Sequence, residues 1–411
     1  MNKFITLFSL IVLISCTKQT KEPIAQSKDT SVADALSARL ESLHKKGMFA
    51  GFGVAIVTAD SVLYQNGFGL SDIKGGKKYT SETVQPIASV SKTFIGIALL
   101  KAQEMGKLKL SDPVNKYLKF TVSNPAFPDT AITLKHLATH TSTLNDEGTV
   151  YMDKGYVLDN DAQPNISPGY PQAFNPASTD NGLEAFLESV LVSGNENYKD
   201  GIYDPFVPGQ NYQYSNIGAS LAALVLEKAT GMPYDHFVSK FILEPLKMND
   251  SGFYGRGTAF KHRSYLYTGN KEVLPMYHCI TYPDGGLVTS AADMGKYLQE
   301  LIKGYHGKGN LLTRESYAQF FTTCLGPKNF IDGREEDNPY SDEYNSVIFI
   351  GFSPKGYIGH TGGDPGISSL MFFDPKTGIG RFLMINTDID DKQANDVFYE
   401  IWDTLDDMTG K

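Results

Sequence analysis

Residues 86–98 decide the fold and read PIASVSKTFIGIA. Within them Ser89 stands three residues before Lys92, at the start of a strongly apolar run. This run predicts a helix over residues 89–106, with Gly106 as its C-cap. Because residues three apart on a helix share a face, we expect the Lys92 amine to reach the Ser89 hydroxyl.

The Ser89–Lys92 pair has a possible chemical use. A serine hydroxyl is a poor nucleophile until a base takes its proton, and a buried lysine can be that base when desolvation destabilises its ammonium. The dipole of a helix N-terminus also favours developing negative charge. The spacing alone is a weak signal, because it recurs at 15–18, 42–45 and 71–74, where a solvated pair is the simpler interpretation.

Two further motifs follow in the chain. Tyr214-Ser215-Asn216 precedes an apolar run, and there a tyrosine can shuttle a proton while an asparagine amide binds a carbonyl. His360-Thr361-Gly362-Gly363 ends a short β-rich run, where glycines let a substrate lie close to the backbone. Taken singly, the first motif is equally a loop tyrosine with a capping asparagine. The second is equally a histidine at a strand end.

In this order, the three motifs resemble the S-x-x-K, Y-x-N and K/H-T-G set of serine penicillin-binding proteins and β-lactamases. Four flanking segments resemble the class C β-lactamase and DD-peptidase branch of that family, namely 106–114, 132–142, 244–248 and 285–293. The resemblance extends from about residue 35 to about residue 390. It implies an α/β (α+β) fold, the β-lactamase/transpeptidase-like fold, with an antiparallel sheet flanked by helices and an inserted helical domain.

The resemblance also implies roles for the motif residues. Ser89 forms an acyl-enzyme, while Lys92 and Tyr214 handle the proton. Asn216 holds the substrate amide. The backbone N–H groups of Ser89 and Gly363 form an oxyanion hole. The resemblance assigns substrate binding to His360, Thr361 and Gly362. Of these, His360 and Thr361 could meet a substrate carboxylate.

This sequence departs from the family pattern at two places. Thr143 stands where the family often has a glycine, which predicts a changed turn in that loop. His360 stands where β-lactamases usually have a lysine, and a neutral histidine attracts a carboxylate less than a lysine does. The second departure argues against efficient β-lactam hydrolysis.

Periodicity predicts strands near both ends of the chain and helices between them. Strands are expected at 52–58, 62–68, 346–352, 357–360, 368–373 and 380–386, and helices at 31–46, 134–139, 217–230 and 391–405. We therefore predict a sheet domain from 32–86 and 265–411, and a mainly helical domain over 87–264. The segment 145–176, rich in Asp, Asn, Gly and Pro, is expected to be a loop that shapes specificity.

The N-terminus predicts export. A basic start and an apolar run lead into Leu13-Ile14-Ser15-Cys16, which resembles a bacterial lipobox. We predict a lipoprotein signal peptide over 1–15, lipidation of Cys16 and a flexible tether over 16–31. An ordinary secretory signal with a chance cysteine is the alternative. The expected location is periplasmic or cell-envelope, on a membrane lipid anchor. An oxidising location leaves open whether Cys279 and Cys324 pair.

Composition and missing motifs exclude other classes. The net charge of −9 argues against nucleic acid as a partner. No G-x-S-x-G elbow is present, which argues against the α/β-hydrolase fold. His136 and His140 are four apart, but Leu137 replaces the glutamate of the zinc-protease pattern, so we interpret both as structural. We expect no metal and no cofactor; the oligomeric state is left open.

The sequence thus predicts a serine hydrolase that acts through an acyl-enzyme on β-lactams, D-alanyl peptides or small esters. The alternative is a penicillin-binding receptor or cell-wall-binding module that is acylated once and does not turn over. Turnover distinguishes the two, since a receptor would be labelled stoichiometrically without accumulating product.

Overall fold

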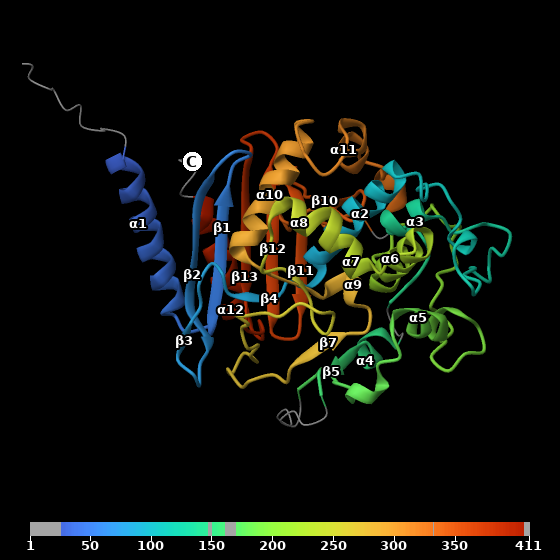
Figure 1. Cartoon of the computed structure of the whole chain (residues 1–411), viewed down its shortest axis with the longest axis horizontal. Helices are drawn as coiled ribbons and strands as arrows, with labels where there is room; N and C mark the ends of the chain where they lie inside the picture. The colour runs from blue at the N-terminus through green and yellow to red at the C-terminus, as the bar shows by residue number, and fades with distance from the viewer. Residues whose placement is uncertain (1–25, 147–149, 161–169, 332, 407–411) are drawn as a thin grey trace, which may run out of the picture.

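The computed structural model describes residues 26–406, except 147–149, 161–169 and 332. Its centre is an antiparallel sheet with the strand order β3-β2-β1-β13-β12-β11-β10-β9 (Figure 1). The strands described are β1 (Gly51–Val57), β2 (Val62–Asp72), β3 (Lys77–Lys78), β4 (Val84–Pro86), β5 (Tyr156–Leu158), β6 (Gly252–Phe253), β7 (Tyr277–Cys279), β8 (Leu287–Ser290), β9 (Asn345–Ser346), β10 (Gly351–Phe352), β11 (Ile358–Asp364), β12 (Ile367–Asp374) and β13 (Ile379–Ile385).

The sheet joins the two ends of the chain, as the sequence predicted. β1 pairs with β13, with Phe52 opposite Ile385. Every residue of β1 is buried, because both faces of the sheet are covered by helices. The helices described are α1 (Gln26–His44), α2 (Lys92–Glu104), α3 (Leu134–Ala138), α4 (Tyr151–Lys154), α5 (Leu183–Leu191), α6 (Asn216–Thr230), α7 (Tyr234–Val238), α8 (Glu244–Leu246), α9 (Tyr282–Gly285), α10 (Ala291–Tyr305), α11 (Arg314–Phe320) and α12 (Lys392–Thr404).

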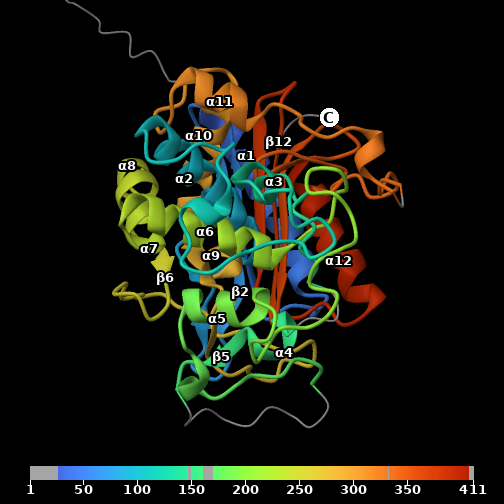
Figure 2. The ribbon, with the colours of Figure 1, turned by 90° about the vertical axis from the view of Figure 1, so that its right-hand side faces the viewer.

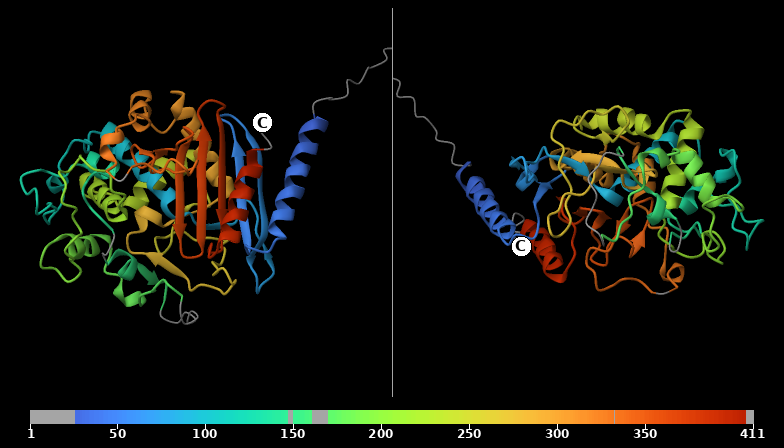
Figure 3. Two further views of the ribbon diagram at one scale, coloured as in Figure 1. Left: turned by 180° about the vertical axis from the view of Figure 1, so that it is seen from behind. Right: turned by 90° about the horizontal axis from the view of Figure 1, so that it is seen from below.

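Helices cover the sheet in two layers. α1 and α12 lie on one face (Figure 3), where the side chains of Ile401 and Trp402 are fully buried. α10 lies on the other face against β1 and β13. The rest of the helical part extends from that side, and Figure 2 views it from the side of α3, α5 and α6. The antiparallel sheet flanked by helices, with a helical part on one side, has the architecture that the sequence predicted.

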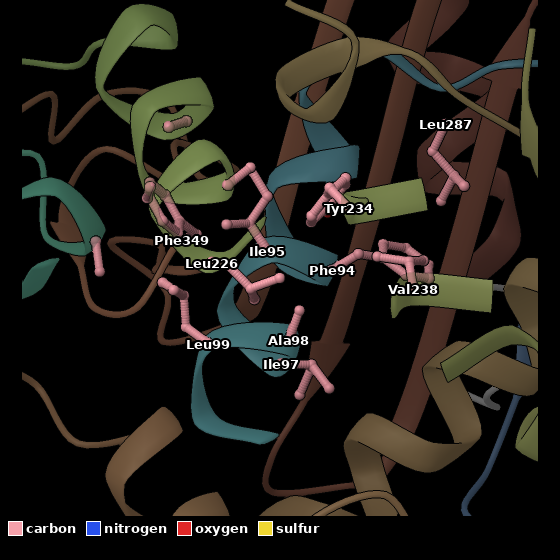
Figure 4. Packing of buried hydrophobic residues seen from close by; sticks show 14 of the residues in the cluster. Phe94, Ile95, Ile97, Ala98, Leu99, Leu226, Tyr234, Val238, Leu287 and Phe349 are labelled. Atoms are coloured by element: carbon pink, nitrogen blue, oxygen red, sulfur yellow. The ribbon is translucent and has the colours of Figure 1, made fainter. Parts of the chain in front are cut away.

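The helical part is built around α2. Its side chains from Lys92 to Leu100 are all buried. Figure 4 shows Phe94, Ile95 and Leu99 of this helix among side chains from α6, α7 and the segment that holds Phe349. A helix apolar on all sides belongs in a core, so α2 is a rigid base for the residues at its start.

Several predicted elements differ from those observed. The helix predicted from residue 89 is an α-helix only from Lys92, because Ala88–Ser91 form a 3₁₀ turn. The run 346–352 is two short strands, since Phe349 has a left-handed backbone (φ 52°) that interrupts extension. The predicted loop 145–176 lies partly outside the described residues, and its described part contains α4 and β5, which pairs with β7. α1 begins at Gln26, earlier than the predicted start at residue 31. The first turn of the helix is polar in sequence, so it gave no apolar periodicity from which to predict a helix.

The remaining expectations concern the cysteines and the N-terminal segment. Cys16 and the signal segment are outside the described residues. Cys279 and Cys324 are both free thiols. None of the described helices has the length and apolar character needed to span a membrane.

Candidate active site

Ser89 lies in a turn that is held from two sides. The turn follows β4, and Ala88 before the serine has a left-handed backbone (φ 49°). The backbone N–H of Ile87 donates to the carbonyl of Leu287 (3.0 Å), and the Ser369 hydroxyl donates to the carbonyl of Ile87 (2.8 Å). A strained, tightly held backbone at such a place is typical of a functional turn.

Lys92 directs all three of its N–H bonds at uncharged oxygens. Its Nζ donates to Ser89 Oγ (3.0 Å), Asn216 Oδ1 (2.6 Å) and the backbone oxygen of Asp284 (2.9 Å). Burial lowers the pKa of this ammonium below the usual 10.5, although four carboxylates act in the opposite direction: Asp284, Asp364, Asp146 and Asp342. The environment therefore favours release of a proton by Lys92.

Tyr214 lies on the other side of the serine. Its hydroxyl shares a hydrogen bond with Ser89, and burial raises its pKa well above 10. The phenol is therefore protonated at neutral pH and can donate. Its ring stacks on His140 (centroids 4.6 Å apart), and Lys92 Nζ lies 5.2 Å from the ring centre. Ser89, Lys92, Tyr214 and Asn216, predicted from two separate motifs, thus lie together in the structure.

His140 and Asp146 hold the tyrosine motif in place. The His140 Nδ1 accepts from the backbone N–H of Ser215 (3.2 Å). The Asp146 carboxylate accepts from the N–H groups of Asn216 and Ile217 at the start of α6, and from the Ser215 hydroxyl (2.8 Å). A carboxylate at a helix N-terminus is favoured by the helix dipole. The sequence analysis did not identify Asp146.

The two histidines considered for zinc have structural contacts instead. His136 Nδ1 accepts from the backbone N–H of Thr133 (3.3 Å) in a capping box at the start of α3. His140 packs against Tyr214, as described above. The part of the chain that the structure describes contains no group of three or more side chains arranged to bind a metal ion.

Thr143, at the position where the family often has a glycine, has a backbone conformation that favours glycine. Its backbone is left-handed (φ 71°), which is costly for a β-branched residue. Its hydroxyl accepts from Asn124 Nδ2 (2.9 Å) in a buried contact, which offsets part of that cost.

Strand β11 lines the cleft beside Ser89. A Cβ placed on Gly362 would come within 2.6 Å of the Ile87 oxygen and 3.1 Å of the Ser89 nitrogen, so only glycine allows this approach. A Cβ on Gly363 would face open space. β10 pairs with β11 only at Ile358 and Gly359, which leaves the edge from His360 onward facing the nucleophile turn.

His360 and Thr361 contact a carboxylate that the sequence analysis missed. His360 Nδ1 lies 2.8 Å from Asp342 Oδ2, and both residues are buried. The Thr361 N–H and hydroxyl also donate to Asp342 Oδ2 (2.7 and 3.1 Å). Burial alone would raise the pKa of Asp342, but His360 and the Thr361 donors outweigh it and lower the pKa to about 2. Asp342 is therefore charged at neutral pH.

Two hollows adjoin these residues. One, of about 460 Å³, lies beside Tyr214 and Asn216, with Phe330, Arg334 and Glu343 on its walls. Another, of about 730 Å³, lies at Gly363; its walls include Tyr170, Thr268, Asp388 and Asp390.

Residues 34–406, nearly the whole described chain, match the family model named Beta-lactamase. The chain belongs to the β-lactamase family. Among curated relatives, penicillin-binding protein 4* of Bacillus subtilis is 27% identical over 350 residues, which are 82% of this chain and 68% of that protein. The chain thus spans about two thirds of the length of this relative.

Solved structures of β-lactamase-family proteins share the fold. A β-lactamase/D-alanine carboxypeptidase from Yersinia pestis, complexed with citrate, superposes with a TM-score of 0.68 at 19% identity, covering 92% of this chain and 100% of that one. A D-amino acid amidase from Ochrobactrum anthropi superposes with a TM-score of 0.64 at 20% identity, covering 91% and 98%. The named relatives include hydrolases of several kinds, so family membership alone leaves the substrate open.

Proposed function

We propose that this β-lactamase-family protein is a serine hydrolase that works through an acyl-enzyme on Ser89. The observation that carries the proposal is the set of contacts made by Lys92: a fully buried amine 3.0 Å from Ser89 Oγ, surrounded by uncharged oxygens and with a lowered pKa. A neutral amine at that position is a base for the serine hydroxyl.

The reaction follows from the positions of the groups. Neutral Lys92 takes the proton from Ser89 as Oγ bonds to the substrate carbonyl carbon, and the carbonyl electrons move to oxygen. The N–H groups of Ser89 and Gly363 stabilise that oxyanion. Tyr214, protonated because it is buried, passes a proton to the leaving group as its bond to carbon breaks. Water then attacks the ester, its proton returns through the same groups, and Ser89 is released.

Substrates of this proposal are carbonyl compounds that fit the cleft: β-lactams, D-alanyl peptides or small esters. The test compares wild type with Ser89→Ala on a nitrophenyl ester, a D-Ala-D-Ala peptide, a small amide and a chromogenic cephalosporin. We expect turnover of at least one, an acyl adduct on the Ser89 peptide by mass spectrometry, and a loss of more than about 1,000-fold in the variant.

Ser42→Ala is the matched control, because Ser42 on α1 and Lys45 just after that helix have the same spacing and are exposed. It should retain wild-type activity. Activity that survives in Ser89→Ala on every substrate contradicts the nucleophile assignment. Stoichiometric labelling of wild type by penicillin without product favours the receptor alternative.

We also propose export and lipid anchoring at Cys16, supported by the lipobox-like sequence 13–16. In a bacterial host, Cys16→Ser should abolish incorporation of labelled fatty acid and release the full chain from the membrane fraction. Unchanged labelling and fractionation contradict this proposal.

A further inference from the structure

Asp342 occupies a set of donors that together form a carboxylate-binding site. A backbone N–H and a hydroxyl, both of Thr361, and the His360 Nδ1 converge on its Oδ2. The Nδ1 also lies 2.6 Å from the Thr361 carbonyl, and since both neighbours are acceptors this nitrogen carries a hydrogen. Charge-assisted hydrogen bonds of this kind are strong when buried.

This set of donors lies beside the reacting centre. Thr361 directly precedes Gly362, whose backbone packs against the nitrogen of Ser89. The His360 ring lies 6.3 Å from the Tyr214 ring, and Tyr214 hydrogen-bonds Ser89. A substrate carboxylate next to the scissile bond would therefore need the same donors.

Asp342 is held firmly in that place. A Cβ on Gly351 would come within 1.9 Å of the Asp342 backbone oxygen, which shows how closely β10 packs against it. Two residues earlier, the Tyr340 hydroxyl donates to Asp403 on α12 (2.8 Å), and the Tyr340 ring contacts Trp402. Displacement of the Asp342 side chain would break three hydrogen bonds and leave a buried charge without partners.

The charges on the walls of the adjoining hollow do not neutralise Asp342. Glu343 and Asp146 line the hollow beside Tyr214. Arg334, on the same walls, stacks on the rings of Phe330 and Tyr344 and forms no salt bridge with Asp342 in the described structure. A second carboxylate at His360 and Thr361 would meet Asp342 at close range, and like charges in such contact cost several kcal/mol.

We infer that Asp342 is a specificity-determining residue that fills the carboxylate position of the cleft, so that the protein prefers neutral esters and amides to substrates with a free carboxylate beside the scissile bond. This inference rests on the proposed hydrolase function and narrows its substrates. It disfavours β-lactams and D-alanyl-D-alanine peptides that end in a free acid. If Asp342 only oriented His360, the protein would instead prefer substrates with a free carboxylate beside the scissile bond.

The test uses two substrates that differ only in that carboxylate: N-acetyl-D-Ala-D-Ala as free acid and as C-terminal amide. Wild type should favour the amide in kcat/KM by at least about tenfold. Asp342→Asn keeps the shape and an acceptor for Thr361 but removes the charge, and it should reduce that ratio about tenfold or more. Glu343→Gln, a matched control, removes the adjacent carboxylate without touching these donors and should change the ratio less than threefold.

A binding measurement keeps the test independent of turnover. In the Ser89→Ala background, calorimetry should find the free-acid peptide bound about tenfold more tightly when Asp342→Asn is added, and the amide bound equally by both proteins. A wild type that favours the free acid overturns the inference, as do equal shifts in Asp342→Asn and Glu343→Gln. Nitrophenyl ester turnover by wild type, abolished in Ser89→Ala, shows in each case that the proposed function itself stands.

Discussion

The cleft has two walls, and each presents a buried basic side chain in a different environment. On the α2 wall, Lys92 contacts three oxygens that carry no charge, and burial lowers its pKa. On the β11 wall, His360 contacts the charged carboxylate of Asp342 directly. Burial among uncharged oxygens therefore favours the neutral form of Lys92, whereas the His360 ring has a charged hydrogen-bond partner.

His278 on β7 is a half-buried basic group that, like His360, contacts carboxylates. Its ring nitrogens lie 3.0 Å from Asp159 and 3.1 Å from Asp180. The two carboxylates raise its pKa to about 9 against the cost of burial. Burial instead lowers the pKa of Lys92 and of His140, which both lie at the Ser89 site.

Replacing the two basic residues in turn gives the largest expected effect. Lys92→Arg keeps the charge, but a guanidinium does not release its proton, so kcat/KM should fall more than about 1,000-fold. His360→Gln loses a hydrogen bond to a charged partner and should cost about 10- to 100-fold. Steady-state kinetics on the ester, with melting curves as the control for folding, measures both. An equal loss of kcat/KM in the two variants would contradict the different roles assigned to Lys92 and His360.

Removing a charge near Lys92 should shift the pH profile. Asp284 raises the pKa of Lys92, so Asp284→Asn should lower that pKa and move the acid limb of kcat/KM to lower pH. Burial raises the pKa of Asp284 itself to about 6, so the two profiles should differ above pH 6 and converge below it. Asp235→Asn, which removes a buried carboxylate on α7, is the control. An acid limb that stays in place would contradict the assignment of Lys92 as the base, and an alkaline limb that moves to lower pH would mean that Lys92 acts as a cation.

The ion pairs of His278 should make stability depend on pH. The pKa of His278 is higher in the folded protein than the unfolded value of 6.5. Its contribution to the free energy of unfolding is therefore fully present below pH 6.5 and is lost as pH rises through about 9. The loss should be on the order of 3 kcal/mol in the free energy of unfolding. Urea unfolding between pH 6 and 10 measures it. His278→Gln should remove this slope and His262→Gln, at an exposed site, should keep it; a slope that persists in His278→Gln contradicts the assignment.

Local patterns predicted much of this molecule. The strand-like runs 52–58 and 62–68, separated by a turn, marked β1 and β2, and Gly231 ended α6 with a left-handed backbone (φ 69°) as expected. Three motifs far apart in sequence identified residues that the fold brings into one cleft. The short helix start at Ser89 was missed because an apolar run does not distinguish a 3₁₀ turn from an α-helix.

The carboxylates of the site could not be predicted in the same way. Asp342 precedes His360 by 18 residues, in an irregular segment without periodicity, and only the packing against Gly351 brings it to the cleft. Asp146 stands shortly after the segment 132–142, which resembles the family. This closeness in sequence was the only hint in the chain that Asp146 lies near the site. The pairing of β5 with β7 depends on contacts over 120 residues apart, which local propensity does not encode.

The proton equilibrium of Lys92 tests the central claim most directly. In protein labelled with ¹³C at the lysine ε-carbon, the Lys92 signal can be assigned by its absence in Lys92→Arg and followed with pH. We predict that the pKa of Lys92 lies below the usual 10.5 and below the pKa of the exposed lysines. A Lys92 that titrates together with the exposed lysines, or after them, would contradict the claim that burial among uncharged oxygens makes it the base for Ser89.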